Sequence, residues 1–183
     1  MLYITRHGQT DWNCKHKMQG QTDIPLNNRG REMAEQAYEE YKELHLDICY
    51  CSPLVRAKET AEIMLRNRNI PIIIDERLIE MGFGEYEGLE NSFSIPDCPI
   101  NAVFQQPEKY TASVGGAESF EELFARTGEF LDNVIYPQLQ QGKDILIVGH
   151  GVMNASIVAQ IKGLPIAQLW SNGIEQCKIT KLL

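Results

Sequence analysis

The stretch Asp144-Ile145-Leu146-Ile147-Val148-Gly149-His150-Gly151 decides the fold class of this chain. Its apolar, largely β-branched run predicts a buried strand, and the glycines around the histidine predict a turn where the strand ends. The start of the chain repeats this arrangement, since Leu2-Tyr3-Ile4-Thr5 runs directly into Arg6-His7-Gly8. Two buried strands are therefore expected, each ending in a histidine turn.

Outward from these two strands, the chain alternates between strand and helix patterns. Besides these two strands, we expect strands near 46–51 and 71–74 and an edge strand near 177–182, and helices over 29–44, 53–66, 118–140 and 151–161. Asn28 and Ser52 are the expected N-caps of the first two helices. This alternation predicts an α/β fold with a largely parallel sheet covered by helices on both faces. Ligands of such sheets bind beyond the carboxyl ends of the strands, so His7 and His150 should face one crevice.

One long segment interrupts the pattern. From 82 to 116 the glycines and prolines break any periodicity, and a stretch of that length without clear structure is usually a functional loop or lid. We therefore expect one domain over 1–183, with a lid or specificity insertion at about 82–116.

Composition limits the function classes. A chain of 183 residues with a net charge of -8 suits one acidic globular domain and disfavours nucleic acid as a partner. An anionic substrate would need a local basic pocket. No apolar run approaches the roughly 20 residues of a membrane span, and the first residues lack a secretory signal. We expect a cytoplasmic protein with reduced cysteines and no membrane partner. The sequence leaves the oligomeric state open, a homodimer included.

The histidine turns carry residue types suited to phosphoryl transfer. A neutral imidazole at His7 is a competent nucleophile toward phosphorus. Arg6 and Arg56 can each grip phosphate oxygens with a planar fork of donors, and His150 supplies a further donor. The two arginines should also keep His7 neutral. Each of these residues alone is more often structural, but together at strand ends they favour a catalytic site.

Glu80 is the candidate proton donor. It lies among apolar neighbours in Leu78-Ile79-Glu80-Met81-Gly82, and a carboxyl group can act in turn as general acid and general base. On its own, a surface glutamate is an equally good interpretation. No carboxylate cluster demands a metal, so we expect neither a metal nor another cofactor.

Five motifs, in order along nearly the whole chain, resemble the histidine phosphatase superfamily in its phosphoglycerate-mutase-like branch. The match is carried by Arg6-His7-Gly8-Gln9-Thr10-Asp11-Trp12-Asn13 with the following Gln19-Gly20 loop, Ser52-Pro53-Leu54-Val55-Arg56-Ala57, Glu80 with Gly84-Glu85-Tyr86-Glu87-Gly88, Gly115-Gly116-Ala117-Glu118-Ser119, and Val148-Gly149-His150-Gly151. Three positions depart from the pattern. Tyr86 replaces a usual tryptophan, Ala117 is inserted, and Gly149 stands where serine is common.

The resemblance implies a three-layer α/β/α sandwich and a role for each motif residue. His7 would be the phosphoacceptor and Glu80 the proton donor, while Arg6, Arg56 and His150 would bind the phosphate. The substrate side would be lined by Asn13, Gln19, Gly20 and Gly151. No metal is implied.

Phosphatase is the favoured activity, acting on a small phosphorylated metabolite. The first alternative is a cofactor-dependent phosphoglycerate mutase, which must hold a carboxylate as well as a phosphate. From 78 to 108 there is no Lys or Arg but several acids, which should repel a second anionic group. The second alternative, from another class, is a non-catalytic phospholigand-binding regulatory module. The complete set of motif residues argues against such a decayed site.

Overall fold

The computed structural model describes residues 1–111 and 114–183, so positions 112–113 of the expected insertion lie outside the described residues. Its centre is a five-stranded sheet in the order β3-β2-β4-β1-β5. The strands are β1 (Leu2–Arg6), β2 (Ile48–Cys51), β3 (Ile72–Ile74), β4 (Ile145–Gly149) and β5 (Thr180–Lys181). All neighbouring strands are parallel except β5, which runs antiparallel to β1 at the edge. The expected mostly parallel sheet is confirmed.

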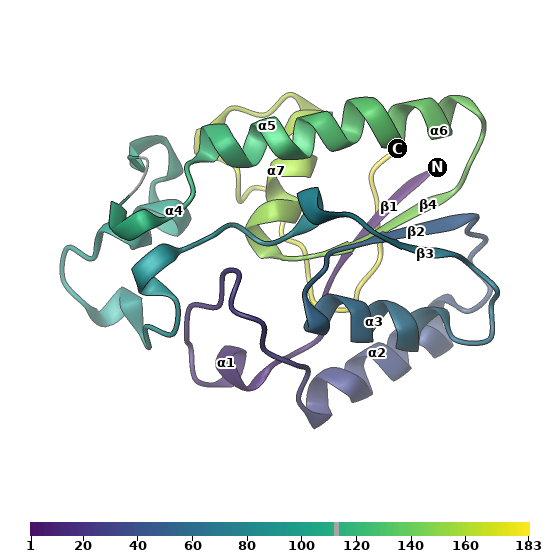
Figure 1. Cartoon of the computed structure of the whole chain (residues 1–183), viewed down its shortest axis with the longest axis horizontal. Coiled ribbons are helices and arrows are strands. Elements are labelled where there is room, and N and C mark those ends of the chain that lie inside the picture. The colour runs from purple at the N-terminus through teal and green to yellow at the C-terminus, as the bar shows by residue number, and fades with distance from the viewer. Residues whose placement is uncertain (112–113) are drawn as a thin grey trace.

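Helices cover both faces of the sheet and complete three layers (Figure 1). The covering helices are α2 (Asn28–Tyr41), α3 (Val55–Leu65), α5 (Phe120–Phe130), α6 (Tyr136–Gln140) and α7 (Gly151–Lys162), whereas the short helices α1 (Asp11–Cys14) and α4 (Ala102–Gln105) lie in loops to one side of the sheet (Figure 1). Leu146 and Val148 pack with α2 and α3, whereas Ile145 and Ile147 pack with α5 and α7. Alternate side chains of β4 thus enter two separate cores, as the period of a strand requires.

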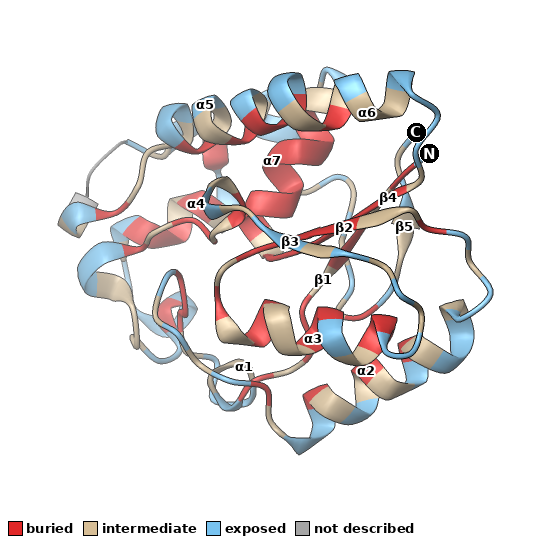
Figure 2. Ribbon diagram, turned by 45° about the vertical axis from the view of Figure 1, so that its right-hand side comes forward, coloured by how far each residue is buried: buried red, intermediate tan, exposed pale blue. Residues whose placement is uncertain are grey.

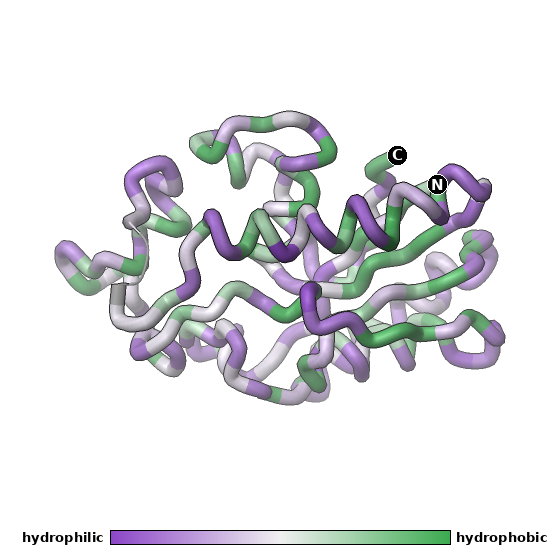
Figure 3. Tube along the Cα trace, turned by 45° about the horizontal axis from the view of Figure 1, so that its top comes forward, coloured by the Kyte–Doolittle hydropathy of each residue, from purple (hydrophilic) through white to green (hydrophobic). Residues whose placement is uncertain are grey.

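The most apolar elements lie innermost. The interior strands and α7 are almost wholly buried (Figure 2), whereas α5 alternates between apolar and polar residues along its length (Figure 3). The continuous apolar run of β4 therefore reflects burial between two layers of helices.

Two of the expected N-caps are wrong. Helix α2 is capped by Asn27, whose side chain accepts from the amide of Gly30, and not by Asn28. Helix α3 begins after Leu54, which has no capping side chain. Asp23, from a distant loop, accepts instead from the Val55 amide at 2.7 Å. The Ser52 hydroxyl is therefore available to bind another residue of the site.

The helix expected over 118–140 is continuous but changes register. Helix α5 passes through a π-helical turn at Leu131–Ile135 before α6. Pro137 lies just inside α6 and has no amide hydrogen to continue the ordinary ladder, which accounts for the shift nearby. The helix begins at Ser119, whose side chain forms a reciprocal capping box with Glu122.

The segment over 82–116 contains more structure than its sequence pattern indicates. Its described part forms α4 and several short 3₁₀ turns, and Ile100 and Val103 are fully buried. Their burial anchors the segment to the core beneath α5 and α7. Within residues 1–111 and 114–183, none of the helices has the length and apolar character that crossing a bilayer requires.

Candidate active site

The predicted site residues meet at the carboxyl edge of the sheet. His7 follows β1, His150 follows β4, and Arg56 lies in the first turn of the helix after β2. They adjoin a cavity of about 710 Å³ whose wall includes eight of the nine predicted residues: Arg6, His7, Asn13, Gln19, Gly20, Arg56, Glu80 and Gly151. The ninth, His150, lies beside His7, with ring centroids 5.2 Å apart. The two histidines therefore lie side by side at one edge of the sheet, although only His7 borders the described cavity.

The hydrogen bonds of His7 define its tautomer. Its Nδ1 lies 2.7 Å from the carbonyl oxygen of Gly8, and the Nε of Arg56 donates to its Nε2 at 3.3 Å. A carbonyl can only accept and a guanidinium can only donate, so Nδ1 carries the proton and Nε2 holds a lone pair. The buried ring therefore presents a nucleophilic nitrogen beside Arg56.

Electrostatics keep this imidazole neutral. Burial lowers the pKa of His7 well below its usual value, and the charges of Arg56 and Arg6 lower it further. The pKa of His150 is lowered in the same way by burial and by Arg56. These directions agree with the predicted effect of the arginines on His7, and they favour the neutral form of His150 over the charged one.

Gly8 allows the loop after β1 to pack closely against helix α2. A Cβ at this position would lie 2.6 Å from the carbonyl oxygen of Gly30, in the first turn of α2. The loop after β1 and helix α2 therefore touch through backbone alone. The Gly8 amide also donates to the hydroxyl of Thr60 at 3.0 Å, which ties the histidine turn to α3.

Arg56 is almost fully buried, and its guanidinium is held by backbone carbonyls. It donates to Gly20 O at 2.7 Å and to Thr22 O at 2.9 Å. Burial lowers its pKa to about 10, which leaves it charged near neutral pH. The carboxylate of Glu87 in turn accepts from the amides of Gln21 and Thr22. Glu87 thus shapes the loop that orients Arg56.

Two buried donors at the site have no protein partner within the described residues. These are Nδ1 of His150 and Nε of Arg6. The other ring nitrogen of His150 lies 2.6 Å from the Ser52 hydroxyl. The Leu54 amide already donates to that hydroxyl, so Ser52 can give its own proton to His150 and leave the proton on Nδ1. Unpaired buried donors are costly unless an acceptor such as a phosphate oxygen occupies the site.

Two amides adjoin the substrate side of the cavity. The Thr10 hydroxyl lies 3.1 Å from Asn13 Oδ1 and 2.8 Å from Gln19 Oε1. Gln176 also donates to Asn13 Oδ1. Because protein donors occupy both carbonyl oxygens, the NH₂ groups of these amides are the parts available to an anionic substrate.

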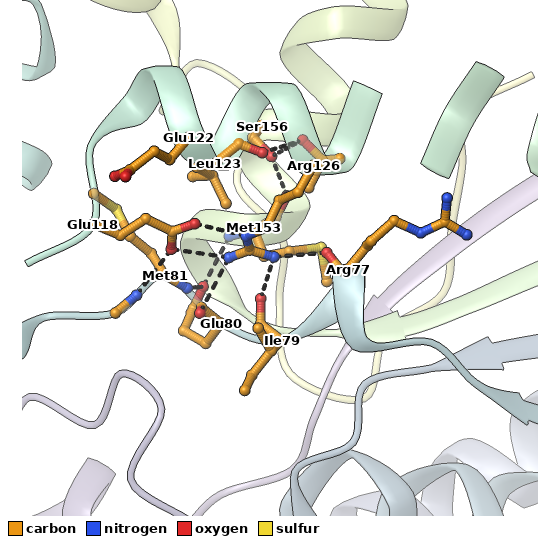
Figure 4. Close-up of polar contacts among 12 residues, drawn as sticks. Arg77, Ile79, Glu80, Met81, Glu118, Glu122, Leu123, Arg126, Met153 and Ser156 are labelled. Atoms are coloured by element: carbon orange, nitrogen blue, oxygen red, sulfur yellow. Dashed lines mark hydrogen bonds and ion pairs between the residues drawn. The ribbon is translucent and has the colours of Figure 1, made fainter. Parts of the chain in front are cut away.

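Glu80 follows the strand β3 in the chain, and its side chain lies against the first turn of α7. Its carboxylate accepts from the amides of Met81, Val152 and Met153 at 2.8, 3.2 and 2.9 Å. Figure 4 shows the surrounding contacts, in which the Arg126 guanidinium reaches from α5 to the backbone on either side of Glu80. Glu80 as a whole is only 7% exposed, and these hydrogen bonds fix its carboxyl group at the cavity wall.

A metal-ligand cluster is absent from the cavity among the described residues. The one group of the right composition is His45, Asp47 and Asp144, at the opposite, amino-terminal edge of the sheet. Its carboxylates already pair with the N-terminal ammonium, Lys143 and His45. It therefore has no connection to His7.

Sequence reasoning missed several residues that support the site. Arg126 and Glu87 orient the segments that carry Glu80 and Arg56, and Asp23 caps α3. No local signal marks Arg126 or Asp23, because their partners lie tens of residues away. Glu87 belonged to a recognised motif, but its contacts are with a loop rather than with the cavity.

Comparisons with known proteins identify the family of this chain. Residues 2–183 match the model of the family described as "Histidine phosphatase superfamily (branch 1)". The chain is 35% identical to the "uncharacterized phosphatase PhoE" of Bacillus subtilis, over 87% of this chain and 76% of that protein. It is 34% identical to a 2,3-bisphosphoglycerate-dependent phosphoglycerate mutase of Cytophaga hutchinsonii, over 82% and 72% of the two chains.

Among solved structures, Bacillus stearothermophilus YhfR superposes with a TM-score of 0.87 at 34% identity, covering 98% of this chain and 88% of that one. The family match spans almost the whole chain, and the shared fold covers the same range. On these grounds the chain belongs to the histidine phosphatase superfamily.

Proposed function

We propose that this protein hydrolyses a small phosphorylated metabolite, a phosphomonoester, through a phosphohistidine at His7. The observation that carries the proposal is the unprotonated Nε2 of His7, buried beside two guanidinium groups at the wall of a cavity. A neutral nucleophile in a cationic pocket is the arrangement that phosphoryl transfer to nitrogen requires.

In the first step, the lone pair on Nε2 of His7 forms a bond to phosphorus while the bond from phosphorus to the alcohol oxygen breaks. The leaving alkoxide takes a proton from the Glu80 carboxyl group. Arg6, Arg56 and the Nδ1 donor of His150 stabilise the charge that spreads over the phosphoryl oxygens. Arg56 gives up its contact with Nε2 as the phosphate enters.

In the second step, water attacks the phosphohistidine. Glu80, now a carboxylate, takes a proton from the water as the new bond between oxygen and phosphorus forms. The bond between phosphorus and Nε2 breaks and returns His7 to its neutral state. Inorganic phosphate leaves, and no electron donor, metal or cofactor enters the balance.

A mutase is the second candidate, because relatives with that name are similar to this chain. The charge argument against it needs correction. Of the acids over 80–108, only Glu80 belongs to the described cavity wall, so the others do not face the substrate. The relevant observation is that Lys17, the one lysine in that described wall, lies 3.8 Å from Glu90. A second anionic group therefore meets a lysine whose charge is already shared.

The test is an assay of two reactions in excess chelator. We expect release of inorganic phosphate from p-nitrophenyl phosphate, because positive charge comes from Arg6 and Arg56 rather than from a metal. We expect no interconversion of 3-phosphoglycerate and 2-phosphoglycerate after priming with 2,3-bisphosphoglycerate. Phosphate release and isomer ratio are measured in the same samples.

Three other outcomes would contradict the proposal in different ways. Efficient interconversion would make the protein a mutase. Loss of activity in chelator, restored by magnesium or zinc, would make it a metal-dependent hydrolase. Tight phosphate binding without turnover would leave a regulatory binding module. A homodimer, a cytoplasmic location and the absence of nucleic-acid and membrane partners stay predictions from the sequence.

A further inference from the structure

The cavity extends well beyond the space that a phosphate group needs. Its volume of about 710 Å³ lies within the range of sites that enclose a whole organic ligand. Besides the phosphate-side residues, its wall includes four aromatic side chains: Phe83, Phe93, Phe104 and Trp170. The alcohol part of the substrate must therefore lie against an aromatic wall.

These four rings form one cluster around Phe104. The ring of Trp170 stacks on it with centroids 5.7 Å apart and an interplanar angle of 24°. Phe83 and Phe93 each lie 5.8 Å from Phe104. Phe93 is 60% exposed, which is unusual for a large aromatic side chain that contacts a hydrophobic cluster. An exposed ring at a cavity wall can gain buried contacts when a ligand enters.

Three polar groups on this part of the wall already have partners. The indole nitrogen of Trp170 donates to Val103 O at 2.9 Å, and the Ser94 hydroxyl donates to Asn91 O at 2.7 Å. Lys17 shares its charge with Glu90 and lies 5.8 Å from the centroid of the Trp12 ring. Trp170, Ser94 and Lys17 are therefore less available to a polyol or a second anion than unpaired groups would be.

We propose that the alcohol carried by the substrate includes a flat, uncharged apolar group, most simply an aromatic ring, which packs among Phe83, Phe93, Phe104 and Trp170. This inference rests on the proposed function, because the phosphate end is fixed by His7 and the arginines. Aromatic contacts favour offset or edge-on packing at 4.5–7 Å, and the cluster offers both kinds of surface.

The test compares phosphate esters of primary alcohols, whose leaving groups are chemically similar. We expect 2-phenylethyl phosphate to exceed glycerol 3-phosphate in kcat/KM by about tenfold or more, with the difference mainly in KM. Phe93→Ala should reduce that preference by about two- to tenfold, the equivalent of one aromatic contact. Ile95→Ala, on the same exposed segment but outside the described cavity wall, is the matched control and should keep the preference.

A binding experiment distinguishes the proposed aromatic site from the proposed hydrolase activity. A non-hydrolysable 3-phenylpropylphosphonate is titrated into the wild type, alongside methylphosphonate. Tighter binding of the aryl compound supports the aromatic site even if no ester is hydrolysed. Equal affinities, or equal kcat/KM for the phenylethyl and glycerol esters, would overturn it. Turnover with no aryl preference would leave the proposed hydrolase intact.

A different observation identifies a positioning residue for Glu80. The Arg126 guanidinium donates to the carbonyls of Arg77, Ile79 and Glu80 at 2.6, 2.8 and 3.2 Å. It also pairs with Glu118 at 2.6 Å, and the same carboxylate accepts from the amide of Gly82 at 3.0 Å. Figure 4 shows this clamp enclosing the backbone before and after Glu80.

We infer that Arg126 sets the distance between the Glu80 carboxyl group and the leaving oxygen. Arg126 contacts no part of the described cavity wall except the backbone of Glu80, so it acts through that residue. A displacement of about 1 Å in a reacting group can reduce the rate by about 10²-fold. The effect should appear only where a proton donor is needed.

Arg126→Met should slow phosphorylation of His7 by 2-phenylethyl phosphate by about 10- to 100-fold, and by p-nitrophenyl phosphate far less. Rapid-quench measurement of the phosphoprotein separates this step from hydrolysis. Arg77→Met is the matched control, because Arg77 pairs with Asp75 and Glu129 instead. If Arg126→Met does not fold, Glu118→Gln tests the same clamp. Equal losses with both substrates would mean a purely structural role.

Discussion

His7→Ala is expected to abolish phosphate release, with a loss on the order of 10⁴-fold or more, as for other residues that form the covalent bond. The reason is chemical, because His7 Nε2 is the nitrogen that accepts from Arg56 within the described residues, whereas Nε2 of His150 is occupied by Ser52. Rapid quenching of the wild type with labelled substrate should trap an acid-labile, base-stable phosphoprotein. The variant should yield none.

Two controls make this result specific. His45→Ala removes an exposed histidine at the opposite edge of the sheet and should keep full activity. His7→Asn keeps a donor for the Gly8 carbonyl and should be as inactive as His7→Ala. Circular dichroism and a thermal melt show whether each variant is folded. A folded His7 variant that retained substantial turnover would refute the phosphohistidine mechanism.

Glu80→Gln should reveal the proton donor through a difference between substrates. Phosphorylation of His7 by an alkyl phosphate should fall by about 10²–10⁴-fold, the usual size of general-acid catalysis. With p-nitrophenyl phosphate the loss should be much smaller, because a phenolate leaves without a proton. The measurement is the burst of phosphoprotein formation for both substrates in wild type and variant.

The hydrogen bonds of the Glu80 carboxylate determine which control the Glu80→Gln variant needs. Three backbone amides donate to its carboxylate, so the amide of glutamine loses one acceptor oxygen at the start of α7. Loss of that hydrogen bond would slow the phosphorylation of His7 by both substrates equally. Glu85→Gln is the matched control, since Glu85 is absent from the described cavity wall. Equal fractional losses with both substrates in Glu80→Gln would exclude it as proton donor.

The structure agrees with the sequence predictions that depend on residues close together in the chain. The apolar run Ile145–Val148 predicted a buried strand, and His150 follows it directly. Parallel strands end at the same edge of a sheet, so the proximity of His7 and His150 followed from topology. The sequence predicted that neighbouring arginines lower the pKa of His7, but burial is the larger cause of that lowering.

The helix caps and the hydrogen bonds that hold the site residues in place could not be predicted in the same way. Ser52 had the right side chain for an N-cap, yet its hydroxyl binds His150 and Asp23 caps α3 instead. A cap depends on which oxygen the folded chain brings to the helix end, and Asp23 lies 32 positions from its partner. Sequence patterns report only on neighbours within a few turns.

The acids after Glu80 illustrate the same limit. Their charge predicted repulsion of a second anion, but Glu87 turns away from the substrate and binds the loop that holds Arg56. Net charge along a segment does not determine the direction of any one side chain. The correct conclusion about phosphatase activity therefore did not need that argument.

By itself, the sequence determined the fold class and predicted the phosphate-side residues and the nucleophile, because the periodicity of burial and the compact motifs can be recognised from adjacent positions. Only the tertiary structure decided the tautomer of His7, the clamp of Arg126 on Glu80 and the aromatic cluster around Phe104. Each of these depends on atoms from elements distant in the chain. Their contacts exist only once helices pack on the sheet and bring those atoms within hydrogen-bonding or van der Waals distance.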